Sequence, residues 1–252
     1  MNRNKTLLLA ALCVALALAG GVLGTLAWLS DRDSVTNTFT VGSVNITLDE
    51  TKVNTNGDPL NADNKPVEED EEPARTGTGN TYKLLPGKVY LKDPTVTVEP
   101  GSVESHLRMV MTVHNAPAVQ AILDEPAHGL TDYADLLVGW KPEVWRYNGF
   151  VYDEEAGTIS FEFRYHETVT GGAEALPLEP LFTGLQVPGT VTGAELKALQ
   201  GGEGPEDDFR IVVTAHAVQA AALDGEDAAW SAFNQQLGWA EGDLQPPADP
   251  EP

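Results

Sequence analysis

The chain has 252 residues, with 38 acidic against 15 basic side chains and a formal net charge of −23. This length is enough for one large domain with a substantial core. Binding to a nucleic-acid backbone, or docking on anionic lipid, requires clusters of lysine and arginine, so the charge argues against both functions.

The N-terminus has the layout of an export signal. Arg3 and Lys5 form a basic start, and a long run free of charge follows. That run is long enough to span a bilayer, so a retained membrane anchor is one interpretation. We favour cleavage of a signal peptide over 1–27, because Thr25 and Ala27 form a small-x-small site that a signal peptidase reads. Removing the two basic residues then takes the net charge from −23 to −25.

The single cysteine, Cys13, lies inside this expected signal. Leu12 precedes it, where a bacterial lipoprotein signal has a small residue, so lipidation is not expected. The processed chain then has no cysteine and no disulfide, and its stability depends on packing alone.

Strand periodicity begins almost at the expected cleavage point. In "VTNTFTV", Val35, Asn37, Phe39 and Val41 share one face and the threonines share the other. After a bend at Gly42, "SVNITL" alternates in the same way. We therefore expect an N-terminal strand segment over 28–50.

Residues 51–80 contain Asn, Gly, Asp, Pro and Glu with almost no large apolar side chains. Such a composition predicts a long, mobile acidic loop. The acidic run from Glu68 to Glu72 lacks the spaced pattern of a calcium loop, so we favour a solvated loop over a calcium site.

Alternating and apolar runs return over 81–240 and predict one antiparallel β-sandwich domain with a few short helices in its loops. A flexible tail is expected over 241–252. The expected strands are 88–91, 93–101, 105–115, a hairpin over 144–167 that turns at 153–157, a short strand within 176–188, and a central strand over 209–221. The expected helices are 117–123, 132–138, 192–199 and 225–238, the last with Trp230, Phe233 and Leu237 on one face.

No assembled active site is visible, and we expect neither an enzyme nor a metal or cofactor. The chain has no Gly-x-Ser-x-Gly elbow, no phosphate-binding glycine loop and no zinc-protease motif. Glu162 and Glu167 fall on opposite faces of one strand, so they are not expected to act as an acid/base pair. The five histidines are isolated in sequence: His106, His114, His128, His166 and His216.

An aromatic group in the middle of the chain has the composition of a carbohydrate-binding surface. Its spacing is more typical of core and cross-strand packing, which we favour. The group comprises Trp140, Trp145, Tyr147, Phe150, Tyr152, Phe161, Phe163 and Tyr165.

The stretch "GTLAWLSDRDSVTNTFTVGSVNITLDE" closely resembles the junction of proteins exported with a SipW-type signal peptide, the TasA/camelysin family of Gram-positive surface and biofilm-matrix proteins. Gly20-Gly21 and Thr25-x-Ala27 match the end of that family's signal. "LLPGKVYLKDPTVTVEPGSVESHLRMVMTV", "YNGFVYDEEAG", "EPLFTGLQVP" and "IVVTAHAVQA" extend the resemblance over most of the chain.

The resemblance implies a jelly-roll-like sandwich, processing by a SipW-type signal peptidase that reads Thr25 and Ala27, and secretion to the cell surface or extracellular matrix. It also implies self-assembly into fibres, in which the freed N-terminal segment donates a strand to the next copy. The membrane is then contacted only through the signal peptide before cleavage. The expected donor residues are Asp31, Asp33, Val35, Thr38, Phe39 and Val41.

Two hypotheses from different classes follow. In the first, the protein is a structural fibre subunit and residues 28–41 are needed for self-association. In the second, the same residues form the first strand of their own domain, and the protein is a monomeric or membrane-tethered module that binds glycan or host matrix. A secreted peptidase is the least favoured class, because the chain has no zinc motif.

Overall fold

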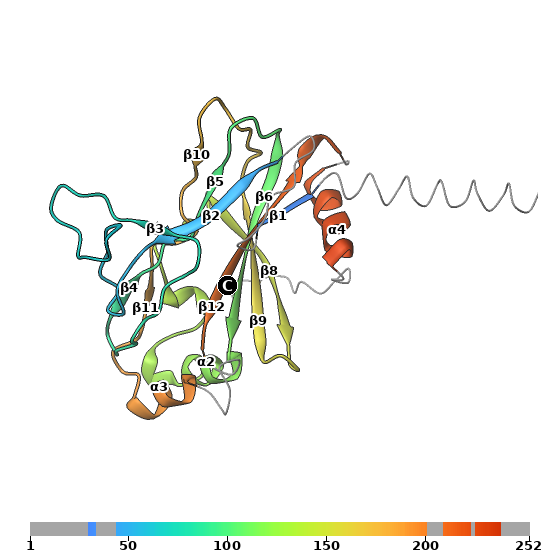
Figure 1. The fold of residues 1–252 in the computed structure, drawn as a ribbon. Helices are drawn as coiled ribbons and strands as arrows, with labels where there is room; N and C mark the ends of the chain where they lie inside the picture. Colours follow the sequence, from blue (N-terminus) through green and yellow to red (C-terminus); the bar gives the residue numbers. More distant parts are fainter. Residues whose placement is uncertain (1–29, 34–43, 201–208, 223–224, 238–252) are drawn as a thin grey trace, which may run out of the picture.

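Two layers of antiparallel sheet form the body of the molecule in the computed structural model (Figure 1). The structure describes residues 30–33, 44–200, 209–222 and 225–237. The expected fold class, an antiparallel β-sandwich with short helices in its loops, is confirmed. No helix in the described ranges is long and apolar enough to cross a membrane.

The first layer is a five-stranded sheet in the order β1-β12-β6-β9-β8. Every neighbouring pair is antiparallel, and β8 and β9 form the expected aromatic-rich hairpin. The strand expected to begin at Ser34 lies outside the described residues, and a short strand precedes it instead. The strands are β1 (Ser30–Asp33), β12 (Ile211–Gln219), β6 (Ser105–His114), β9 (Thr158–Tyr165) and β8 (Trp145–Asp153).

The second layer contains a four-stranded sheet, β10-β5-β2-β3, and a three-stranded sheet, β4-β11-β7. Most of these strands are short, because prolines and glycines interrupt the extended runs. The four-stranded sheet contains β10 (Leu176–Pro177), β5 (Thr95–Val98), β2 (Ile46–Thr51) and β3 (Arg75–Thr76). The three-stranded sheet contains β4 (Val89–Leu91), β11 (Gly184–Gln186) and β7 (Leu137–Val138).

The main hydrophobic core lies between the two layers. Strand β6 alternates as its sequence predicts, and one face places four apolar side chains in the core. Apolar side chains of β2 and β5 meet them from the opposite layer, and the indole of Trp145 donates a hydrogen bond to the Glu179 carbonyl (2.9 Å). The four β6 residues are Leu107, Met109, Met111 and Val113, each at most 2% exposed.

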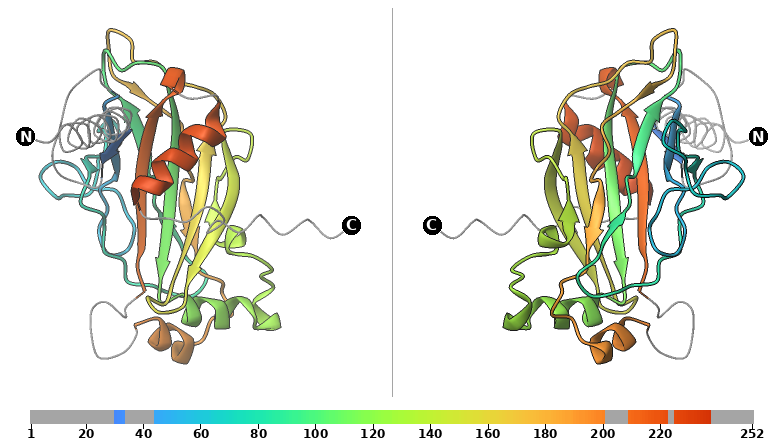
Figure 2. Two further views of the ribbon diagram at one scale, coloured as in Figure 1. Left: turned by 90° about the vertical axis from the view of Figure 1, so that its right-hand side faces the viewer. Right: turned by 90° about the vertical axis from the view of Figure 1, so that its left-hand side faces the viewer.

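Short helices close the sandwich. Figure 1 shows α2 and α3 together at one end, and Figure 2 shows α4 lying across the outer face of the five-stranded sheet. The helix expected over 132–138 is instead a 3-10 turn followed by β7, because the Asp132–Asp135 capping box closes one turn before the chain pairs with β11. The helices are α2 (Ala116–Leu123), η1 (Pro126–His128), η2 (Tyr133–Leu136), α3 (Gly193–Leu199), η3 (Ala220–Ala222) and α4 (Glu226–Leu237).

The segment 51–80 differs from the mobile loop that its composition predicts. Side-chain amides replace apolar burial: Asn54 accepts hydrogen bonds from the N–H groups of Asn56 and Asp58, and Asn61 accepts from two N–H groups of the next turn. Two isolated bridges and the β2–β3 pairing complete the segment. The prediction of a mobile loop considered only how much apolar surface the segment can bury. It did not consider the hydrogen bonds from side chains to the backbone that order this segment.

Helix α3 begins with a capping box that the sequence already contains. The Thr192 hydroxyl accepts from the Glu195 N–H, and the Glu195 carboxylate accepts from the Thr192 N–H and hydroxyl. These hydrogen bonds, with a further one from His128, lower the pKa of Glu195 to about 2 from its ordinary 4.5. The stability that this carboxylate contributes is complete above pH 4.5 and is lost as the pH falls toward 2.

We therefore expect Thr192→Ala to lower the free energy of unfolding by about 1 kcal/mol, and to move the Glu195 pKa back toward its ordinary value. Urea unfolding measures the first effect, and an NMR pH titration of the Glu195 carboxyl carbon measures the second. Thr192→Ser is the matched control, because it keeps the hydroxyl. A Glu195 titration unchanged in Thr192→Ala contradicts the assignment.

Candidate functional site

Strand β12 is paired along its whole length on one side and along only half of it on the other. It pairs with β6 from Ile211 to Gln219, but with β1 only from Ala215 to Val218. Among the described residues, no strand pairs with Ile211–Thr214 on the β1 side. An uncovered strand edge is a template for pairing with another extended segment.

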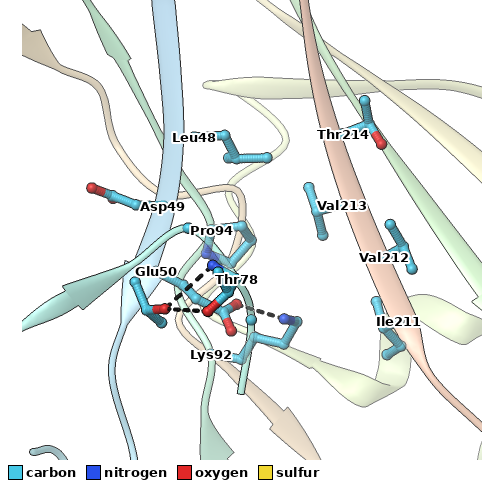
Figure 3. A pocket seen from close by; sticks show the side chains of 13 residues that line it. Leu48, Asp49, Glu50, Thr78, Lys92, Pro94, Ile211, Val212, Val213 and Thr214 are labelled. Carbon is cyan, nitrogen blue, oxygen red and sulfur yellow. Dashed lines mark hydrogen bonds and ion pairs between the residues drawn. The ribbon is translucent and has the colours of Figure 1, made fainter. Parts of the chain in front are cut away.

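A cleft of about 560 Å³ opens beside Ile211–Thr214 of β12. Figure 3 shows side chains of β2 on one wall and those of β12 on the other. The cleft thus lies between the edges of the two layers, in line with the end of β1. Its lining residues are Leu48, Asp49, Glu50, Thr76, Gly77, Thr78, Gly79, Lys92, Pro94, Ile211, Val212, Val213 and Thr214.

The two walls of the cleft differ in chemistry. The β12 wall carries three consecutive β-branched apolar residues, and the middle one, Val212, is 42% exposed. The β2 wall is polar, but Lys92 and Glu50 neutralise each other in a buried ion pair of 2.5 Å. An extended segment with one apolar and one polar face fits such a space, because alternate side chains then meet alternate walls.

The rim of the cleft is held in place by Arg75. Its guanidinium bonds to Asp49 on β2 (2.7 Å) and to Asp93 (2.8 Å). Asp93 also accepts from the N–H (2.6 Å) and hydroxyl (2.7 Å) of Thr51. The rim therefore keeps its shape through side-chain contacts that join β2, β3 and the start of β5.

The other edge of the five-stranded sheet is protected. Strand β8 contains a register shift between Tyr147 and Gly149, where Gly149 has φ 134°. A bulge of this kind bends and twists an edge strand and so discourages pairing with another chain. The exposed Tyr152 is the large apolar side chain on this edge that is comparable to Val212. The Ile211–Thr214 half of β12, which extends beyond β1, is thus a better template than β8.

The structure places only part of the predicted donor segment. Asp31 and Asp33 lie on β1, opposite Ala217 and Ala215 of the same chain. The other residues proposed for strand donation or signal processing lie outside the described residues: Thr25, Ala27, Val35, Thr38, Phe39 and Val41.

The run 209–221 is expected to form a central strand because it is apolar on both faces, and β12 does lie between β1 and β6 in the five-stranded sheet. Sequence reasoning did not locate the cleft beside Ile211–Thr214, because residues far apart in the sequence line it and no local pattern signals it.

A second buried polar group lies on the outer face of the five-stranded sheet, under α4. Glu162 bonds to Arg108 (3.3 Å) and Arg164 (2.5 Å), and Arg108 donates to His216 Nδ1 (3.1 Å). Burial lowers the pKa of Arg108 to about 10. Because α4 covers this group with Trp230, it attaches the helix to the sheet and is closed to substrates.

The remaining chemical candidates have structural roles. Glu167 is exposed and contacts His166, while Glu162 is buried, so the two carboxylates do not form an acid/base pair. In the described ranges, no three His, Cys, Asp or Glu side chains gather as metal ligands. Most of the aromatic group packs as predicted, for example Trp145 against Tyr165 and Tyr147 against Phe163.

Comparisons with known proteins give no match: no family model, curated protein or solved structure is similar to this chain at a significant level.

Proposed function

We propose that the protein is an exported structural subunit of fibres at the cell surface or in a biofilm matrix. Its N-terminal segment leaves its own chain and pairs with β12 of the next copy, in the cleft described above. The observation that carries the proposal is the β12 edge at Ile211–Thr214, which no strand among the described residues covers, which continues the line of β1 and which has an apolar wall. The resemblance of the N-terminal junction to SipW-type exported proteins supports the same reading.

The observed register sets the geometry of exchange. Asp33 lies opposite Ala215 in an antiparallel pair, so the same ladder continued by two residues brings Val35 opposite Val213. Strand exchange replaces the β1–β12 hydrogen bonds within one chain by the same hydrogen bonds between two chains. The net change in free energy is therefore small. Because each copy gives a strand at one place and receives one at another, the contact does not close and a fibre grows.

The proposal gives each residue of the segment a role. Asp31 and Asp33 form part of the β1 ladder, Val35 extends it along the cleft, and Thr38 continues the strand beyond Ile211. Phe39 and Val41 are the apolar anchors of the donated strand. Before assembly, a SipW-type signal peptidase reads Thr25 and Ala27 and frees this segment. The partner is thus another copy of the chain, and no catalytic step or cofactor is involved.

One observation favours the alternative, a monomeric or membrane-tethered surface module that binds glycan or host matrix. Within a single chain, β1 already pairs with β12 over four residues. If that pairing is permanent, the N-terminal strand belongs to its own domain and no segment is free to be donated.

A truncation distinguishes the two. The chain from Trp28 to Pro252 is compared with one that begins at Gly42, by size-exclusion chromatography and electron microscopy. We expect filaments or oligomer ladders from the longer chain and none from the shorter one. A stable monomer from the longer chain, together with an unstable shorter chain, contradicts strand donation and favours the surface module.

A further inference from the structure

Three polar side chains meet at the wall of the cleft, which Glu50 and Lys92 line, and Asn80 is a third member that a simple ion pair does not require. Lys92 Nζ lies 2.5 Å from Glu50 Oε2, and the Asn80 side-chain amide donates to the other oxygen, Glu50 Oε1, at 2.7 Å. The side chains of Lys92 and Glu50 are 8% and 7% exposed. One buried carboxylate therefore holds an amine and a carboxamide side by side.

The carboxamide of Asn80 is fixed at both ends. Its oxygen accepts from the Val53 N–H at 2.9 Å, and its nitrogen also donates to the Thr51 carbonyl at 2.8 Å. A hydrogen bond to the carbonyl oxygen makes the side-chain carbon more electrophilic and stabilises negative charge there. The hydrogen bond from the amide nitrogen to Glu50 places a proton carrier beside the leaving group.

From this geometry we propose that Lys92 and Asn80 become joined by an intramolecular amide bond, with Glu50 carrying the protons. This is a self-modification site; it does not depend on fibre assembly and goes beyond the proposed structural role. The Glu50 carboxylate is in contact with the Lys92 amine and is placed to accept its proton, and a neutral lysine amine is a nucleophile.

The steps balance in atoms and charge. Glu50 takes one proton from the Lys92 ammonium, and the neutral amine attacks the Asn80 side-chain carbon. The oxygen of the tetrahedral intermediate is stabilised by the Val53 N–H. Glu50 passes its proton to the Asn80 nitrogen, and the bond between that nitrogen and carbon breaks. The new amide loses its second proton to the departing ammonia, which leaves as ammonium while Glu50 returns to a carboxylate.

Tyr82 lies close to the cluster, and Tyr90 packs against the Tyr82 ring. Tyr90 is 1% exposed, and the Tyr82 ring meets it edge-on at 5.5 Å. The Tyr82 hydroxyl donates to the Leu91 carbonyl (2.9 Å), and burial together with the charge of Glu50 raises the pKa of Tyr82. Limited access of water favours amide formation over hydrolysis and strengthens the interactions of Glu50 with both reactants.

The consequence is a covalent ring over 80–92. Asn80 directly follows the rim of the cleft, and Lys92 directly follows β4. The bond thus ties the rim to the end of β4, which holds the mouth of the cleft open when the molecule is pulled.

Mass spectrometry of the full chain tests the proposal. We expect an intact mass lower than the sequence mass by one ammonia molecule. After digestion with trypsin, peptide 76–83 is expected to be attached to peptide 89–108, which stays uncut at Lys92 because its amine is blocked. The intact mass alone does not prove the cross-link, because an Asn-Gly pair such as Asn56-Gly57 also loses ammonia when it cyclises. Detection of the linked peptide distinguishes the cross-link from that reaction.

Three variants complete the test. Lys92→Arg keeps the charge but removes the nucleophile, and Glu50→Gln removes the proton carrier; neither is expected to give the linked peptide. Lys88→Arg replaces a lysine outside the cluster and is expected to leave the cross-link intact. Recovery of peptides 76–83, 89–92 and 93–108 as separate species from the unaltered, folded chain overturns the proposal.

Discussion

We expect replacement of Val212 by lysine to abolish the proposed fibre assembly and to leave the subunit folded. Val212 is 42% exposed on the half of β12 that no strand of the described residues covers, so its replacement is expected to change the stability of the monomer little. A lysine at an edge is one of the devices that prevent strand pairing, because its charge must be desolvated when another strand arrives. Electron microscopy and size-exclusion chromatography of the variant measure the loss of assembly, and circular dichroism checks the fold.

Tyr152→Lys is the matched control for Val212→Lys. Both residues are exposed apolar side chains of the same sheet, but Val212 lies on the half of β12 beyond the end of β1, whereas Tyr152 lies on the bulged edge strand β8. The control is expected to assemble normally, whereas charged residues at both Phe39 and Val41 should stop assembly from the donor side. If Val212→Lys assembles as well as Tyr152→Lys, the cleft is not the acceptor.

Replacing Glu162 by alanine is expected to lower the free energy of unfolding by about 3–5 kcal/mol, the largest effect on stability that we expect. Glu162 is fully buried and is the carboxylate that contacts both Arg108 and Arg164. Its removal leaves two buried guanidinium groups close together without their shared carboxylate, and Asp227 remains as a partner of Arg164. Urea unfolding followed by tryptophan fluorescence measures the loss, since Trp230 lies 4.5 Å from the Arg108 guanidinium.

Arg146→Ala provides the comparison for Glu162→Ala. Arg146 also pairs with a carboxylate, Glu226 at 3.0 Å, but its side chain is 53% exposed. Solvent screens such a pair, so a loss below about 1 kcal/mol is expected. Equal losses in the two variants contradict the view that burial makes the Glu162 group important for stability.

Local patterns predicted much of the fold. The β8–β9 hairpin follows from two alternating aromatic runs around a turn, and α3 begins where Thr192 and Glu195 form a capping box. Helix α4 follows from the spacing of Trp230 and Phe233, which are both buried. These elements depend on contacts between residues close in sequence, so their signals are present in short windows.

Long-range contacts were not predictable in the same way. Arg108 alternates with core residues on β6 and therefore reads as a solvent-facing side chain, yet α4 covers it completely. Which strand lies beside β12, and over how many residues, depends on sheet order rather than on local pattern. The Lys92–Glu50–Asn80 cluster likewise joins three elements, and no spacing rule brings them together.

The most direct measurement of strand exchange uses two single-cysteine chains. The single cysteine, Cys13, lies outside residues 28–252, so in chains that begin at Trp28, Val35→Cys in one and Val213→Cys in another introduce the only thiols. Directly opposite residues of an antiparallel pair have Cα atoms about 4.5–5.5 Å apart, which allows a disulfide. Strand exchange predicts a disulfide between the two different chains when they assemble together under oxidation. A disulfide that forms only when both cysteines are on one chain, and never between chains, contradicts it.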